Sequence, residues 1–163
     1  MMSNNIMRYN RAYAEIGAKT PIPADCGKLC DARCCKGDNH CGMIVFPGEE
    51  QILSAHGFPI VSKNMHGYPI SFTTCNGHCR RIFRPLSCRI FPLVPNICNN
   101  VLSITEDPRA KLLCPLLSTH TIDQSFYNAV YQAFLILIDD PLIQQMLVHY
   151  TAMLDEYRSF WGE

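Results

Sequence analysis

Cysteines are the residues of this sequence with the clearest capacity for chemistry. The chain has 163 residues and ten cysteines, and none of them lies in the first 25 residues or in the last 49. Thiolates are soft ligands that bind zinc, copper and iron–sulfur clusters. The ten are Cys26, Cys30, Cys34, Cys35, Cys41, Cys75, Cys79, Cys88, Cys98 and Cys114. Their distribution predicts one cysteine-cluster region, which we place at residues 20–115.

The redox compartment decides whether such cysteines form disulfides or bind metal. The N-terminal stretch MMSNNIMRYNRAYAEIG has no continuous apolar segment of the kind found in secretory signals. No apolar run approaches the roughly 20 residues of a membrane helix. We therefore expect a cytoplasmic protein, in which clustered thiols serve as metal ligands or redox centres. A disulfide framework is the alternative interpretation.

The spacing of the cysteines favours an iron–sulfur cluster over zinc. The first group is Cys26-x3-Cys30-x3-Cys34-Cys35, the second is Cys75-x3-Cys79-x8-Cys88, and Cys114-Pro115 follows. Zinc sites commonly use C-x2-C pairs, which are missing here, whereas iron–sulfur ligands have more varied spacing and a Cys-Pro step closes the bacterial ferredoxin motif. We predict a 4Fe–4S cluster, with zinc as the alternative, because eight thiols could also serve two tetrahedral zinc sites. The predicted metal ligands are Cys26, Cys30, Cys34, Cys35, Cys75, Cys79, Cys88 and Cys114.

Several residues beside these cysteines need separate interpretation. Arginines crowd around Cys79 and Cys88, and guanidinium groups would offset the negative charge of a thiolate-bound cluster. Arg84 and Arg89 are the predicted cofactor contacts, and a solvated basic loop is the alternative.

The neighbouring side chains of Cys34 and Cys35 point in different directions, so either they serve two sites or one of them is a bridging or spare thiol. Cys98 lies among asparagines, and we expect it not to be a ligand. His40 and His78 adjoin cysteines and could complete a mixed Cys/His ligand set, but we expect them to be loop residues or groups that contact the ligands.

One block of this region resembles a known family. The string Cys79-x4-Arg84-Pro85-x2-Cys88-Arg89-x-Phe91-Pro92 follows a Cys-Cys pair and the segment FPGEE. This arrangement resembles cysteine-cluster proteins described as a zinc- or iron-chelating domain, over residues 26–115. The matching residues are Cys30, Cys34, Cys35, Cys79, Arg84, Pro85, Cys88 and Arg89, and Cys75 and Cys114 are compatible with the pattern. The usual first motif of the family, C-x2-C-x2-C-C, is more tightly spaced than the one here. The family includes a flagellin lysine-N-methylase, although most members have no established activity.

Hydrophobic periodicity predicts the elements that position these residues. Residues 5–17 and two segments within 121–161 have helical apolar faces, and Asp140-Pro141 separates the last two. Residues 43–46 are expected to form a strand, residues 47–57 a helix, residues 57–74 an extended region and residues 75–98 an irregular one. The predicted class is α+β, mostly α, in a single domain of residues 1–163. It comprises a small, irregular, metal-stapled, cysteine-rich core, an N-terminal helix and a C-terminal antiparallel αα-hairpin at 121–161.

Composition limits the functions that are plausible. The 14 basic and 14 acidic residues balance, so we expect neither nucleic acid nor a membrane as partner. No G-x-G loop, H-E-x-x-H motif or Ser-His-Asp set is apparent. The expected function is a redox or metal-binding module. The alternatives are a metal-dependent protein lysine methylase-like enzyme, which would act on a protein substrate, and a structural metal site in an interaction protein. The sequence leaves both catalysis and the oligomeric state open.

Overall fold

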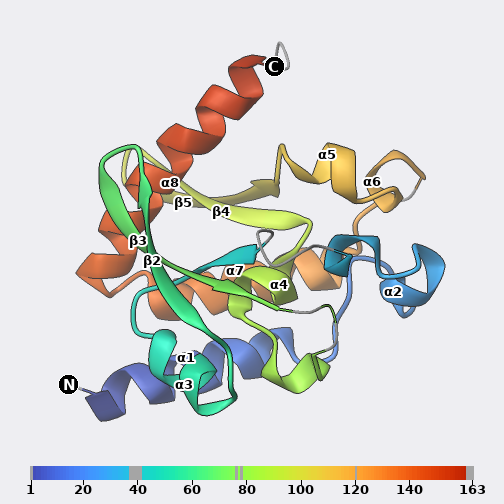
Figure 1. The fold of residues 1–163 in the computed structure, drawn as a ribbon. Coiled ribbons are helices and arrows are strands. Elements are labelled where there is room, and N and C mark those ends of the chain that lie inside the picture. Colours follow the sequence, from blue (N-terminus) through green and yellow to red (C-terminus); the bar gives the residue numbers. More distant parts are fainter. Residues whose placement is uncertain (1, 37–41, 76, 78, 120, 161–163) are drawn as a thin grey trace.

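The computed structural model describes residues 2–36, 42–75, 77, 79–119 and 121–160 (Figure 1). Helices account for 51% of it, and the strands form two small antiparallel sheets. The predicted α+β class is therefore confirmed. Among the described residues, none of the helices combines the length and the apolar character that crossing a membrane requires.

Two helices from opposite ends of the chain form one layer of the core. Helices α1 (Met2–Ile16) and α7 (Gln124–Leu137) pack against each other. Tyr9 and Ile16 of α1 and Phe134 of α7 are almost completely buried, as their helical periodicity predicts. Asp123 caps α7 by accepting hydrogen bonds from the backbone N–H groups of Ser125 and Phe126.

The strands form the second layer. Strands β1 (Gly42–Val45), β3 (Tyr68–Thr74) and β2 (Ile60–Met65) form one sheet in the order β1-β3-β2. Helix α3 (Glu50–Ala55) connects β1 to β2. Strands β4 (Leu93–Cys98) and β5 (Val101–Glu106) form a separate hairpin. The two layers meet where the Phe46 ring packs edge-on against Phe134, with the ring centroids 5.2 Å apart.

The two C-terminal helices do not form the predicted antiparallel hairpin. Helix α8 (Pro141–Phe160) packs mainly on β4, whereas α7 packs on α1, and Figure 1 shows α8 leading away from α7 towards the C-terminus. The reason is that their apolar faces serve different neighbours. The α8 face includes Ile143, Leu147 and Leu154, and these side chains are buried in one core that α8 shares with α1, α7 and the strands. The prediction of both helices is therefore confirmed, and the prediction that they pack against each other is wrong.

Four described cysteines, Cys26, Cys34, Cys35 and Cys88, fall within a set of six short helical elements. These elements are α2 (Cys26–Leu29), the 3-10 turns η1 (Arg33–Cys35) and η2 (Arg81–Phe83), α4 (Leu86–Ile90), α5 (Ala110–Leu113) and α6 (Leu116–Thr119). Figure 1 shows α2, α5 and α6 on one side of the fold, away from the start of α1. The region 75–98 is more ordered than predicted, since it contains α4 and β4. Its prolines are compatible with this order: Pro85 immediately precedes α4, and Pro95 lies in a strand that has only one partner.

Candidate metal centre

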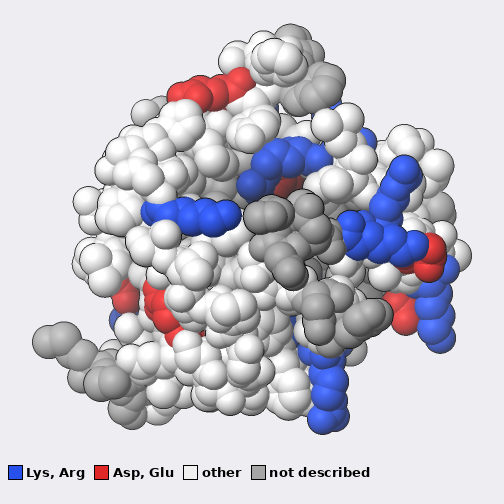
Figure 2. Space-filling model, in the orientation of Figure 1, with Lys and Arg blue, Asp and Glu red and all other residues white. Residues whose placement is uncertain are grey.

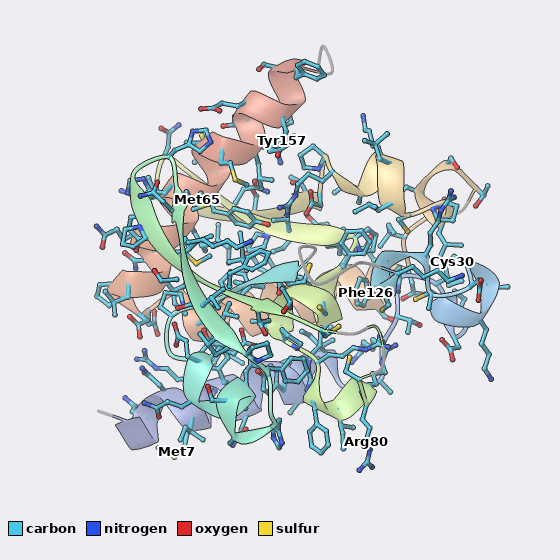
Figure 3. The ribbon with its side chains drawn as sticks, viewed as in Figure 1. Met7, Cys30, Met65, Arg80, Phe126 and Tyr157 are labelled. Carbon is cyan, nitrogen blue, oxygen red and sulfur yellow. The ribbon has the colours of Figure 1, made fainter. Side chains whose placement is uncertain are left out.

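The eight cysteines predicted as metal ligands lie around two neighbouring cavities. The first cavity, of about 40 Å³, is lined by Cys26, Cys30, Cys34, Cys88 and Cys114. The second cavity, of about 170 Å³, is lined by Cys34, Cys35, Cys75, Cys79 and Cys88. Cysteines from three separate parts of the chain therefore meet at one place. Figure 3 shows Cys30 on the side of the fold where α2 lies.

The first cysteine segment owes its shape to a cap and a tight turn. The Asp25 carboxylate accepts a hydrogen bond of 3.1 Å from the Gly27 N–H and so starts α2 at Cys26. Asp31 and Ala32 then adopt left-handed backbone conformations, with φ of 53° and 47°. Such conformations are strained for alanine. They turn the chain between α2 and η1, so that cysteines from both elements line the first cavity.

The second segment approaches the first through a glycine. Gly77 lies between Cys75 and Cys79 and has a φ of +81°. A Cβ at this position would lie 2.8 Å from the carbonyl oxygen of Cys35. Glycine is therefore needed both for its backbone conformation and for its close contact with η1. This contact brings the loop of Cys75 and Cys79 against Cys35.

The third segment is α4, whose first turn is held by a buried carboxylate. Glu49 is 0% exposed, and its Oε1 accepts hydrogen bonds of 2.6 Å from both the Leu86 N–H and the Tyr13 hydroxyl. Its Oε2 accepts a longer bond, of 3.3 Å, from the Phe46 N–H. Because Leu86 is the first residue of α4, Glu49 fixes the start of the helix that carries Cys88. Sequence analysis missed this role and assigned Glu49 only to the start of the preceding helix.

The two predicted cofactor contacts occupy different positions. Arg84 lines both cavities and hydrogen-bonds to Cys79, and its Nε is buried with no hydrogen-bond partner in the described part of the protein. Arg89 lines only the first cavity. Its Nε donates to the Arg84 carbonyl over 2.8 Å, and its guanidinium lies 4.0 Å from the Tyr13 ring centroid. Arg89 thus holds the loop in place, while Arg84 retains an unused donor between the cavities.

The thiols differ in how readily they ionise. A hydrogen bond from Cys34 lowers the pKa of Cys35 to about 6, against the opposing effect of burial, and the same bond raises the pKa of Cys34. Burial raises the pKa of Cys26, Cys79 and Cys88. These three are therefore neutral thiols at neutral pH, and a metal ion that binds them would displace protons.

The remaining candidates lie elsewhere or outside the described residues. Cys98 is exposed at the end of β4, and neither cavity includes it. Cys41, His40 and His78 are outside the described residues. All nine described cysteines are free thiols. Within the described ranges, no three Cys, His, Asp or Glu side chains are arranged so that they could hold a metal ion. The metal-stapled core therefore stays a prediction.

Comparisons with known proteins add no relative. No family model matches the chain, and neither the curated proteins nor the solved structures include a significant match. The functional argument therefore depends on the residues themselves.

Proposed function

We propose that this protein binds metal through its cysteine cluster, that the metal is held as an iron–sulfur cluster of the 4Fe–4S type, and that the protein works as a redox or metal-binding module. The observation that carries this proposal is the convergence of Cys26–Cys35, Cys75–Cys88 and Cys114 on two adjoining cavities. Apolar packing accounts for Cys26 and Cys114, which lie in a small cluster with Ile22 and Leu116, and not for the exposed or half-buried cysteines of η1 and the Gly77 loop. A shared metal-binding role accounts for the arrangement.

The chemistry around the thiols fits an iron–sulfur cluster. A cluster with four thiolate ligands has a net negative charge and carries inorganic sulfides that accept hydrogen bonds. The Arg84 Nε is a buried donor without a partner in the described structure, and burying such a group without a partner costs free energy. A sulfide of the cluster would supply the acceptor. Zinc remains the alternative metal. The ligands of a zinc site would be thiolates alone, without an inorganic sulfide.

The proposed setting is a reducing cytoplasm, in which free thiols persist. Figure 2 shows basic side chains on the side of the molecule where α2 lies. The exposed ones near the cysteines are Lys28, Arg33, Lys36 and Arg80. Asp25 and Asp31 are exposed beside them, and Lys36 pairs with Asp31, so the surroundings of the cysteines carry charges of both signs. We propose that the centre exchanges electrons or metal with a protein partner.

Anaerobic purification with metal and sulfide analysis tests the proposal. We expect iron and acid-labile sulfide in equal amounts, with broad visible absorbance that bleaches on reduction. The variant for comparison is Cys79→Ser/Cys88→Ser. It should contain less metal than the wild-type protein, because serine is a harder and poorer ligand for a soft metal.

Stoichiometric zinc without sulfide in the same anaerobic preparation would overturn the iron–sulfur assignment. Wild-type protein that contains no metal and takes up none in reconstitution would overturn metal binding altogether. Zinc found after aerobic purification would not decide between the metals, because thiols vacated by a lost cluster readily bind zinc. The metal content of the anaerobic sample therefore decides between iron and zinc.

A further inference from the structure

We infer that Tyr13, on the N-terminal helix, is a positioning residue for the proposed metal centre, because its hydroxyl and its ring each hold a group that fixes the segment 82–88. This inference rests on the proposed function and deepens it. The segment carries Arg84 and Cys88, and both of these residues line both cavities, so a shift of the segment would disturb each cavity at once. Tyr13 itself belongs to α1, which carries no cysteine.

The hydroxyl of Tyr13 acts through Glu49. It donates a hydrogen bond of 2.6 Å to Oε1 of that carboxylate, and the same oxygen accepts the Leu86 N–H, also over 2.6 Å. Leu86 begins α4, and Cys88 lies in the same turn. Because Glu49 is fully buried, loss of the hydroxyl would leave a buried oxygen short of a donor instead of solvated. The Tyr13 hydroxyl therefore secures the acceptor that starts the helix of Cys88.

The ring of Tyr13 acts through Arg89. The Arg89 guanidinium lies over this ring, 4.0 Å from its centroid, in a cation–π contact. Its Nε donates a hydrogen bond of 2.8 Å to the Arg84 carbonyl, and one of its terminal nitrogens donates to the Ile82 carbonyl. Arg89 thus ties two backbone carbonyls of the segment before α4 to the face of Tyr13, and this fixes the backbone from which the Arg84 side chain extends.

Apolar packing alone does not explain both contacts. Tyr13 is only half-buried at the edge of the core, where phenylalanine would supply the same apolar contact. Tyr9, one turn earlier on α1, is the fully buried tyrosine, and its hydroxyl donates to the Pro47 carbonyl over 3.0 Å. The two tyrosines therefore have different roles. Tyr9 anchors α1 to the turn before α3, whereas Tyr13 reaches the segment 82–88 through two charged side chains.

A matched pair of substitutions on one helix tests the inference. Tyr13→Phe and Tyr9→Phe each remove one hydroxyl and one hydrogen bond from α1, but only Tyr13→Phe weakens the hold on α4. In anaerobically purified protein, we expect Tyr13→Phe to release metal to a chelator about tenfold faster than the wild type, as loss of a hydrogen bond to a charged group implies. Tyr9→Phe should match the wild type. Tyr13→Leu should release metal faster still, because it also frees Arg89.

Thiol labelling reports on the position of Cys88 without metal. After chelation, alkylation of Cys88 relative to the exposed Cys98 should be faster in Tyr13→Phe than in Tyr9→Phe. Adding Tyr13→Phe to Glu49→Gln should change this ratio little, because the effects of two residues that act through one another are not additive.

The outcomes separate this inference from the proposed function. Equal metal release and equal alkylation of Cys88 in Tyr13→Phe and Tyr9→Phe would overturn the role of Tyr13 and leave metal binding standing. Faster alkylation of every cysteine in Tyr13→Phe, with a lower melting temperature than Tyr9→Phe, would indicate general unfolding and would also overturn that role. Wild-type protein without metal would overturn the proposed function, while the labelling of Cys88 would still measure the hold of Tyr13 on α4.

Discussion

The Tyr13 hydroxyl donates a hydrogen bond of 2.6 Å to the carboxylate of Glu49, on the same oxygen that accepts the Leu86 N–H. One buried carboxylate thus joins α1 to the first turn of α4. Burial raises the pKa of Glu49 to about 7, although its hydrogen-bond donors act in the opposite direction. A buried acid with such a pKa makes folding depend on pH.

Stability should fall as pH rises through the titration of Glu49. In the unfolded chain its pKa is about 4.5, so between that pH and about pH 7 the folded protein holds a proton that the unfolded chain has lost. The stabilising contribution is complete below about pH 4.5 and is lost as pH approaches 7, with a total of about 3 kcal/mol. Urea unfolding between about pH 5 and pH 8 measures it, and Glu49→Gln should show a flatter dependence. Parallel curves for the two proteins would contradict the assignment to Glu49.

Cysteine substitutions should divide into two classes. Cys30→Ser, Cys34→Ser, Cys79→Ser and Cys88→Ser are each expected to lower the metal content clearly, because each replaces a thiolate with a harder and poorer ligand for a soft metal. Cys98→Ser should retain all of it, since Cys98 is exposed at the end of β4 and lines neither cavity. Metal per chain across these five variants is the measurement. Equal loss of metal in Cys98→Ser and Cys88→Ser would show that the predicted ligand set is wrong.

Metal removal should loosen the cysteine-bearing turns. Neither α2 nor η1 has a buried residue, so little apolar packing stabilises them. We expect chelation to lower the melting temperature by about 5 °C or more, given that 1 kcal/mol corresponds to about 2–4 °C at this size. Trypsin should then cut faster after Lys28 and Arg33, while cleavage after Lys63, which is exposed in β2, should not change. Identical melting and cleavage with and without metal would argue against a stapling role.

A glycine pair offers a test of the approach between Gly77 and Cys35. Gly77 and Gly67 both have positive φ, of +81° and +87°, so alanine costs similar backbone strain at either position. Only at Gly77 would the new Cβ meet another backbone, 2.8 Å from the Cys35 oxygen, because Gly67 has open space around it. Gly77→Ala should therefore lower metal occupancy and Gly67→Ala should leave it unchanged. Equal occupancy in both variants would mean that the loop can shift without cost.

Regular periodicity explains which parts of the fold were predictable. The apolar faces of α1 and α7 repeat at helical spacing, and Tyr9, Ile16 and Phe134 are buried as expected. Pairing was harder to predict, because α7 and α8 follow one another in sequence while each packs mainly on a different element. Sequence adjacency was the wrong guide there, and α8 packs on β4 instead.

The sequence indicated which cysteines would lie together, whereas their role as metal ligands stays a prediction and their arrangement could not be predicted. Spacing selected the eight cysteines that line the cavities, and it left Cys98 out. It did not indicate how they meet in space, because that depends on how η1 and the Gly77 loop fold against each other. Glu49 was missed for a similar reason: a glutamate at the start of a helix is usually solvated, and only the packing of α1 and α4 shows that this one is enclosed.

The position of Cys114 has a consequence for how the protein is made. Cys114 lines the same cavity as Cys26, Cys30 and Cys34, which are translated much earlier. A growing chain would therefore present an unfinished set of thiols until the segment that carries α5 has left the ribosome. Metal captured before that moment would lack the Cys114 thiolate and would be open to exchange. Stable loading is thus expected to follow synthesis of the β4–β5 hairpin and α5, which makes metal delivery a late step in maturation.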